Sequence, residues 1–293
     1  MAGLLAAGSG RVLATPGTRA PRRRPQVETI QDVIDLIVSE ILPEPLERTI
    51  DTVKVGDPSQ RVTGVASTFL PTFDVLKRAH AIGANLVIPH EPTWYNHYDH
   101  VEHLQGDAVY EAKMRFLEDT GMVIWRFHDY SHRMKPDVII RGVVRRLGYE
   151  DCQGDPDDDR LYDIPAISFE DLVQRCKTRL GIPYLKVVGD PGTNCRRVAI
   201  FVGWGSAGIL DDDQVLYLVK KKADVVICGE SAEWVTCEYV RDAMEAGVGK
   251  GLILLGHAAS EEPGTQDVVE WLQPLIPDVK VTFVAAGDPF RFL

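Results

Sequence analysis

The segments ANLVIPHE (residues 84–91) and ADVVICGE (residues 223–230) share the pattern Ala-x-x-Val-Ile-x-x-Glu. In each segment a run of aliphatic side chains ends in polar residues, as in a buried strand that leads into a loop. Helical patterns flank both segments, so strands and helices alternate along the chain. This alternation predicts an α/β fold of two similar βαβ-containing halves, with parallel strands in each half.

The elements around the first segment follow a regular order. Glycines close the three expected helices, because a chain often leaves a helix through a left-handed residue. The expected spans are a strand at 61–67, a helix at 72–83, the strand at 84–91, a helix at 107–121, a strand at 122–128 and a helix at 135–148.

The same order restarts after an acidic loop and a connecting helix at 168–181. The second set comprises strands at 196–203, 223–230 and 251–257, with helices at 211–222 and 232–247. We therefore divide the chain into four spans: a flexible N-terminal tail at 1–26, a first α/β half at 27–149, a connecting segment at 150–195, and a second α/β half at 196–293 that carries GHAASE.

The tail, MAGLLAAGSGRVLATPGTRAPRRRPQ, has neither a strand nor a helix period and contains an Arg-Arg-Arg cluster. We interpret it as a flexible extension of a cytoplasmic protein. The alternative is a twin-arginine export signal whose true start lies upstream of Met1. The sequence contains no apolar run of about 20 residues, so we expect no membrane-spanning helix.

The chain is acidic, with a formal net charge of −11 and an isoelectric point near 5.2. Nucleic acids and anionic membranes repel such a chain overall, so we expect neither as a partner and a small-molecule substrate instead. The five cysteines form no CxxC motif and are odd in number. This pattern argues against a zinc ribbon and a disulfide framework, and we expect reduced, mostly buried thiols.

Polar residues at the ends of the later strands also correspond. FHDYSH (127–132) and GHAASE (256–261) share the pattern His-x-x-Ser. Ligands gather outside the carboxyl ends of parallel strands, so we expect both loops at one cleft between the halves. Taken alone, the pair in GHAASE is also the weak i,i+4 ion pair of many surface helices. The corresponding residues are His128 with His257, and His132 with Glu261.

Five side chains at these strand ends are candidate metal ligands: His90, Glu91, His132, His257 and Glu261. Imidazole and carboxylate groups together suit Zn²⁺, Fe²⁺ or Mn²⁺ better than Ca²⁺ or Mg²⁺. Five ligands are too many for one four-coordinate ion with an open position, so we expect two divalent ions per chain. A carboxylate can bridge such a pair, and Glu261 is our candidate. The alternative for any single histidine is a structural, hydrogen-bonded role.

Two further side chains are candidates for proton transfer, Glu230 and His128. Glu230 occupies the position of Glu91 in the second segment, and its alternative role is a charge at the N-terminus of the helix that follows. Trp94 and Tyr95 are candidates for stacking on a substrate ring. His97 lies in a polar run that we interpret as solvated, although it can also reach the cleft.

At these residues the sequence resembles the NIF-three-like dinuclear metal-centre family, also called type 2 GTP cyclohydrolase homologues. The similarity extends from about Val27 to Phe290, through VTGVAST, GANLVIPHEP, HDYSH, ADVVICGE and GHAASE. The resemblance implies two similar α/β halves, a dinuclear metal site between them and a toroidal homohexamer.

The resemblance also assigns site residues one by one. His90, His257 and Glu261 match the family's ligands directly. Glu91 stands where the family usually has a second His, and His132 stands where it usually has the ligand Asp. These exchanges cancel, because three imidazoles and two carboxylates remain, so we predict that metal binding is retained. Trp234 stands where the family often has a His, which leaves the substrate chemistry open.

These observations favour a dinuclear, metal-dependent hydrolase that acts on a small molecule. The alternative is a non-enzymatic metal-binding or regulatory scaffold that forms a ring-shaped oligomer. A third possibility is an α/β protein without metal, in which the histidines are structural.

Overall fold

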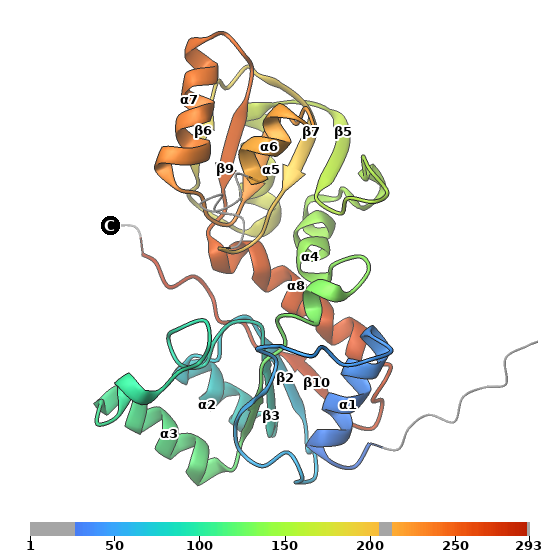
Figure 1. Cartoon of the computed structure of the whole chain (residues 1–293), viewed down its shortest axis with the longest axis vertical. Coiled ribbons are helices and arrows are strands. Elements are labelled where there is room, and N and C mark those ends of the chain that lie inside the picture. The colour runs from blue at the N-terminus through green and yellow to red at the C-terminus, as the bar shows by residue number, and fades with distance from the viewer. Residues whose placement is uncertain (1–26, 205–212, 292–293) are drawn as a thin grey trace, which may run out of the picture.

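The computed structural model describes residues 27–204 and 213–291 of the chain, and the predicted tail at 1–26 lies outside them. It is a mixed α/β structure with two five-stranded sheets (Figure 1). The first sheet has the strand order β1 (Val53–Val55), β4 (Val123–Trp125), β3 (Leu86–Pro89), β2 (Val65–Thr68) and β10 (Val281–Phe283). The second has the order β5 (Leu161–Ser168), β7 (Asn194–Ile200), β8 (Val225–Cys228), β9 (Gly251–Leu254) and β6 (Lys186–Gly189).

The two quoted segments form the middle strands of the two sheets. ANLVIPHE supplies β3, which pairs in parallel with β2 and β4, and ADVVICGE supplies β8, which pairs in parallel with β7 and β9. Every residue of both strands is buried, as expected for parallel strands covered on both faces. The α/β fold class and the parallel pairing are therefore confirmed.

The helices lie on the faces of the sheets and between them (Figure 1). Asp107 and Asp137 cap the N-termini of α3 and α4, and Gly121 and Gly148 close these two helices as predicted. Gly181 closes α5, whereas α2 ends at Ala81 with Ile82 as its C-cap, before the predicted Gly83. The helices are α1 (Ile30–Ile41), α2 (Phe73–Ala81), α3 (Ala108–Thr120), α4 (Val138–Leu147), α5 (Phe169–Leu180), α6 (Asp213–Val219), α7 (Glu238–Glu245) and α8 (His257–Leu272). Short 3-10 turns at Glu102–Leu104, Ser131–Arg133 and Glu150–Cys152, and a π-helical turn at Glu233–Cys237, complete the described elements.

Helices α4 and α8 cross each other between the two sheets and connect the part of the chain around each sheet (Figure 1). At the crossing Gly142 faces Gly264, and a Cβ atom added to either would overlap the other helix's backbone. Beside them Asp267 is fully buried and accepts hydrogen bonds from Arg145 and Arg146. Helix α8 begins soon after β9 of the second sheet. The crossing therefore places the residues at the start of α8 near the first sheet.

Three strands depart from the predicted spans. The segment at 150–195, predicted as a connection, supplies β5 and β6 to the second sheet. The last strand, β10, falls in the predicted second half but pairs with β2 of the first sheet. The chain therefore crosses between the sheets more often than the four spans describe, and the division into halves stays a prediction.

Two further expectations from the sequence are addressed by the structure. All five cysteines are free thiols, and three of them, Cys176, Cys195 and Cys228, are buried, as predicted. Within the described residues, no helix combines the length and the apolar character needed to cross a membrane.

Candidate metal centre

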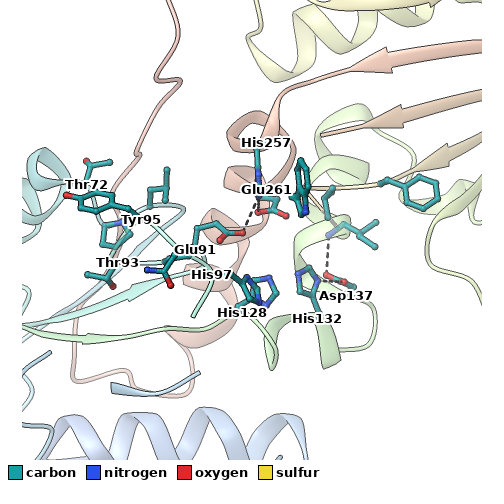
Figure 2. A pocket seen from close by; sticks show the side chains of 18 of the residues that line it. Thr72, Glu91, Thr93, Tyr95, His97, His128, His132, Asp137, His257 and Glu261 are labelled. Carbon is teal, nitrogen blue, oxygen red and sulfur yellow. Dashed lines mark hydrogen bonds and ion pairs between the residues drawn. The ribbon is translucent and has the colours of Figure 1, made fainter. Parts of the chain in front are cut away.

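The predicted site residues gather where β3, β4 and β9 end, on both sides of a cavity of about 890 Å³ (Figure 2). His90 and Glu91 follow β3, and the His128–His132 loop follows β4. His257 and Glu261 lie on the first turns of α8, which begins soon after β9. Parallel strands end on the same side of a sheet, so the topology brings these polar residues to one place.

A buried arginine organises the end of β3. Arg126 is fully buried, and its Nε donates to the backbone oxygen of His90 at 3.1 Å. Its Nη2 donates to Oε2 of Glu91, also at 3.1 Å. A buried carboxylate needs such a partner, because desolvation otherwise drives it toward its neutral form. The other oxygen of Glu91 remains directed at His257, with Oε1 3.2 Å from Nε2.

His257 is surrounded by three carboxylates. Its Nε2 lies 3.2 Å from Glu91 Oε1 and 3.1 Å from Glu261 Oε2, and its Nδ1 lies 3.5 Å from Glu230 Oε1. Burial by itself lowers the pKa of this imidazole, but the hydrogen bonds that the ring donates to the carboxylates outweigh burial and raise the pKa to about 12. In the absence of any other cation, the imidazolium supplies the positive charge that these carboxylates require.

The side chain of His90 contains a buried nitrogen, Nε2, that lacks a hydrogen-bond partner among the described residues. Its Nδ1 lies 3.2 Å from the backbone oxygen of Phe127, which places a proton on Nδ1, so the neutral imidazole carries its lone pair on Nε2. This buried Nε2 faces Glu261 Oε2 at 3.4 Å. Burial lowers the pKa of His90, yet the charge of Glu261 overcomes this effect and the pKa is raised.

The two histidines of the HDYSH loop are each oriented by a carboxylate. His128 Nδ1 lies 3.0 Å from Asp129 Oδ1, and His132 Nδ1 lies 2.8 Å from Asp137 Oδ2. In both cases the other ring nitrogen, Nε2, is free of that bond. A carboxylate on the far nitrogen is the usual support of a metal-binding histidine. Burial lowers the pKa of His128 to about 4.

Two groups of three side chains have ligand atoms close enough to hold an ion, and they share His90. In each group the atoms lie within 4.8 Å of one another. The donors are imidazole nitrogens and carboxylate oxygens, which fits a first-row divalent metal. One group is His90, Glu91 and Glu261, and the other is His90, His128 and His132.

Comparison with known proteins agrees with this fold. The Duf34/NIF3 (NGG1p interacting factor 3) family matches residues 29–289. The chain belongs to this family. A protein of Clostridium perfringens (strain 13 / Type A) named "GTP cyclohydrolase 1 type 2 homolog" is 24% identical over 279 residues, which is 90% of this chain and 99% of that protein.

Solved structures similar to this Duf34/NIF3 chain share its fold. A hypothetical protein of Staphylococcus aureus superposes with a TM-score of 0.70 at 18% identity, over 92% of this chain and 100% of its own. A Bacillus cereus protein related to NIF3 superposes with a TM-score of 0.69 at 15% identity, with the same coverage. At these identities the likeness concerns the fold alone.

The structure brings the predicted site residues of this Duf34/NIF3 protein together, but they divide into two groups that the sequence did not predict. Glu91, His257 and Glu261 contact one another around Nε2 of His257. His132 instead groups with His90 and with His128, whose ring centroid lies 4.9 Å away. His128, predicted for proton transfer, therefore lies among candidate ligands. Glu230 is absent from the cavity lining, and its carboxylate lies 3.5 Å from Nδ1 of His257.

Four residues that orient the site were not predicted: Arg126, Asp51, Asp129 and Asp137. Asp51 is buried, and its carboxylate accepts from the backbone nitrogens of His128 and Tyr130, which fixes the HDYSH loop. The sequence carried a signal for Arg126 only. A lone arginine inside the run MVIWRFH has to find a buried anionic partner, because buried charges are rarely left unpaired.

The aromatic residues after β3 divide into two kinds. Trp94 is buried beneath Tyr110, so its predicted stacking on a substrate is wrong. Tyr95 is 61% exposed and lines the cavity, as the prediction requires. His97 is exposed, as expected for a solvated run, and it also lines the cavity and packs edge-on against His128, as the alternative allowed.

Proposed function

We propose that this Duf34/NIF3 protein binds two divalent metal ions, Zn, Fe or Mn, and hydrolyses a small-molecule substrate beside them. The observation that carries the proposal is Nε2 of His90, a buried nitrogen that carries the lone pair of the neutral imidazole, has no hydrogen-bond partner among the described residues, and lies 3.4 Å from Glu261 Oε2. An unsatisfied buried acceptor costs stability, about 1–3 kcal/mol, unless something binds it. A metal ion is the partner that suits both an imidazole lone pair and a carboxylate.

The proposed ligands are His90, Glu91, His132, His257 and Glu261. Arg126 occupies one oxygen of Glu91, so Glu91 offers only Oε1. Oε2 of Glu261 lies within 3.4 Å of His90 Nε2 and 3.1 Å of His257 Nε2. Glu261 is therefore the carboxylate best placed to serve two ions, as a bridging ligand must.

When bound, two divalent ions would supply a nucleophilic water at neutral pH and would neutralise negative charge that develops on the substrate. Glu230 and His128 are the proposed proton-transfer groups. Glu230 Oε1 lies 3.5 Å from His257 Nδ1, at the edge of the ligand group, and its side chain is 37% exposed and so reaches solvent. Asp129 holds Nδ1 of His128 and leaves Nε2 available to the cavity.

Metal content is the first test. Protein purified without chelator and without nickel affinity resin is expected to contain about two ions per chain by elemental analysis. His257→Ala should lower that content, whereas Glu245→Gln, at the exposed end of α7, should not. Less than about half an ion per chain, unchanged in His257→Ala, would refute metal binding.

Activity distinguishes a hydrolase from a scaffold. Metal-loaded protein is screened against cyclic amidines, phosphoesters and peptides. The cyclic amidines include a purine, because the Clostridium relative is named after GTP cyclohydrolase. We expect turnover of one class, and Glu230→Gln should suppress it while the metal content is retained. No turnover in any class would favour the non-enzymatic, metal-binding scaffold.

The remaining predictions from the family resemblance join this proposal. We propose a homohexamer and a cytoplasmic location. Light scattering coupled to gel filtration gives the number of copies of the 32.6 kDa chain in the particle. Intact-mass analysis of protein from its native host reports whether an N-terminal signal has been removed.

A further inference from the structure

The cavity extends past the candidate ligands into a second region, the side arm, lined by Thr72, Thr93, Tyr95, Asn96 and Lys113. Figure 2 shows Thr72, Thr93 and Tyr95 together on the side of Glu91 that faces away from His132. None of these residues belongs to the candidate metal-ligand groups. The side arm therefore needs a separate explanation.

Lys113 places a buried ammonium in the side arm. The residue is 3% exposed, and its Nζ donates to the backbone oxygen of Thr93 at 2.9 Å. An ammonium has three donors, and that bond is the single one it makes within the described part of the chain. The Nζ also lies 5.1 Å from the ring centroid of Trp94 and 5.5 Å from that of Tyr95. With one carbonyl and two aromatic rings as its neighbours, the ammonium keeps N–H groups that can donate to an anionic ligand.

A second unsatisfied donor lies beside it. Thr93 is buried, and its Oγ1 has no hydrogen-bond partner among the residues described. Buried hydroxyls are normally bonded, so a lone one that lines a cavity indicates a ligand group. Because Lys113 is bonded to the backbone of Thr93, the ammonium and the hydroxyl are held next to each other.

Tyr95 is held in a backbone conformation that side chains avoid. Its φ is +62°, in the left-handed region, which costs a tyrosine about 1 kcal/mol. The surrounding loop outweighs this cost. Asp99 Oδ1 accepts from the nitrogens of Thr93 and Trp94, and Asn96 Nδ2 donates to the oxygens of Trp94 and His100. Strain of this kind concentrates at functional sites, where it fixes a side chain in a useful position.

The exposed ring of Tyr95 is thus a rigid aromatic face beside two unsatisfied donors. Planar rings stack on tyrosine in offset or edge-on geometry, and a ring seated there would carry its substituent toward Lys113. Glu91, two residues before Thr93, lines the same cavity, so the opposite end of such a molecule would point to the candidate ligands.

We propose that the side arm binds an oxyanion, a carboxylate or a phosphate ester, borne by an aromatic ring that stacks on Tyr95. As a statement about the substrate it rests on the proposed hydrolase function. The binding itself needs no metal, since Lys113, Thr93 and Tyr95 are not ligands. Burial lowers the pKa of Lys113 to about 8, so the group is still mainly an ammonium at neutral pH.

Calorimetric titration of the full chain, with metal and after chelation, tests the proposal. The probes are phenyl phosphate, benzoate and the neutral benzyl alcohol. Phenyl phosphate or benzoate should bind to both forms of the protein, and which one binds identifies the oxyanion. Lys113→Met should weaken that binding by about tenfold or more, as expected for the loss of a charged hydrogen bond. Lys77→Met, which removes an exposed lysine stacked on Phe73, is the matched control and should change nothing.

A second variant keeps the test informative if Lys113→Met does not fold. Tyr95→Ala should weaken phenyl phosphate or benzoate but leave inorganic phosphate unchanged. The proposal is overturned by any of three results: equal affinity of Lys113→Met and wild type, binding of benzyl alcohol as tight as that of the anions, or loss of anion binding on chelation. The last result would place the anion on the metals, whereas a failed hydrolase screen leaves the binding result intact.

Discussion

Arg126 and Glu91 form a buried ion pair, with Nη2 of the arginine 3.1 Å from Oε2 of the glutamate. The arginine side chain is fully enclosed and the glutamate side chain is 13% exposed. Glu91 stands where the Duf34/NIF3 resemblance leads one to expect a histidine. A carboxylate there needs a positive neighbour, and Arg126 supplies it from the end of β4. The glutamate in place of the expected histidine is therefore compensated by Arg126, which lies outside the candidate ligands, as well as by the exchange at His132.

Removing one member of this pair should cost more than removing both. Arg126→Met leaves the Glu91 carboxylate buried without its partner, and we expect a loss of about 3–5 kcal/mol in the free energy of unfolding. The double variant Arg126→Met/Glu91→Gln should recover part of that loss, because residue 91 is then neutral and no longer needs the arginine. Urea unfolding measures both. Arg241→Met, at an exposed i,i+3 pair with Glu238, is the control and should change little. Strictly additive effects would contradict the coupling.

Metal should stabilise the fold through the same group. A ligand that binds only the folded state adds about 2.7 kcal/mol at a free concentration of 100 times its Kd. Stripping the ions should therefore lower Tm, and adding Zn²⁺ should restore it. Glu261→Gln should abolish the response, since its carboxylate contacts both His90 and His257. Glu245→Gln should respond like the wild type. If added metal left the Tm of the wild type unchanged, this result would contradict the proposed site.

The backbone crossing of α4 and α8 gives a separate prediction. A methyl group at Gly142 would overlap the backbone of Gly264, so Gly142→Ala requires the helices to separate. Overpacking of this kind typically costs about 1–3 kcal/mol, and more when backbone has to move. Urea unfolding should show the loss. Gly192→Ala, on an exposed turn where the added methyl meets only a flexible carboxylate, should stay within about 0.5 kcal/mol. Equal stability of the two variants would mean that the helices adjust freely.

The sequence predicted those elements whose pattern is local. β3 and β8 are continuous aliphatic runs bounded by polar residues, and three helices end at glycine. Two of the strands that it missed, β6 and β10, lack such a pattern. β6 contributes the exposed Lys186 and Val187 at a sheet edge, and β10 is three residues long. Its pairing of Val281 with Val65 joins residues far apart in the chain, which no local period can reveal.

The site shows the same division. Histidines and glutamates after strands were predicted because the topology of a parallel sheet collects strand ends. The partition of these residues was not, since it depends on side-chain contacts such as that of His132 with Asp137. Asp51 contacts the backbone of His128, 77 positions later, and nothing near it in the sequence marks that role. Support of this kind becomes visible only once the loops are placed.

The depressed pKa of Lys113 gives the chain a pH dependence that one substitution can isolate. Burial lowers this pKa from its ordinary 10.5 to about 8 in the folded protein, whereas the unfolded chain keeps the ordinary value. Between these two values the unfolded state binds more protons, so the folding stability contributed by this group rises with pH. Relative to Lys113→Met, the wild type should gain about 2 kcal/mol between about pH 7.5 and about pH 9.5.

Urea unfolding of both proteins across this range measures the gain, and the comparison removes the titration of tyrosines and thiols that they share. Lys77→Met should follow the wild type at every pH, because its lysine stacks on Phe73 at the surface of α2. A constant difference between wild type and Lys113→Met would mean that Lys113 keeps its ordinary pKa. It would then hold its proton as firmly as a solvated lysine, through the charge of Asp99 together with the partial charges of Thr93 O and the two aromatic rings.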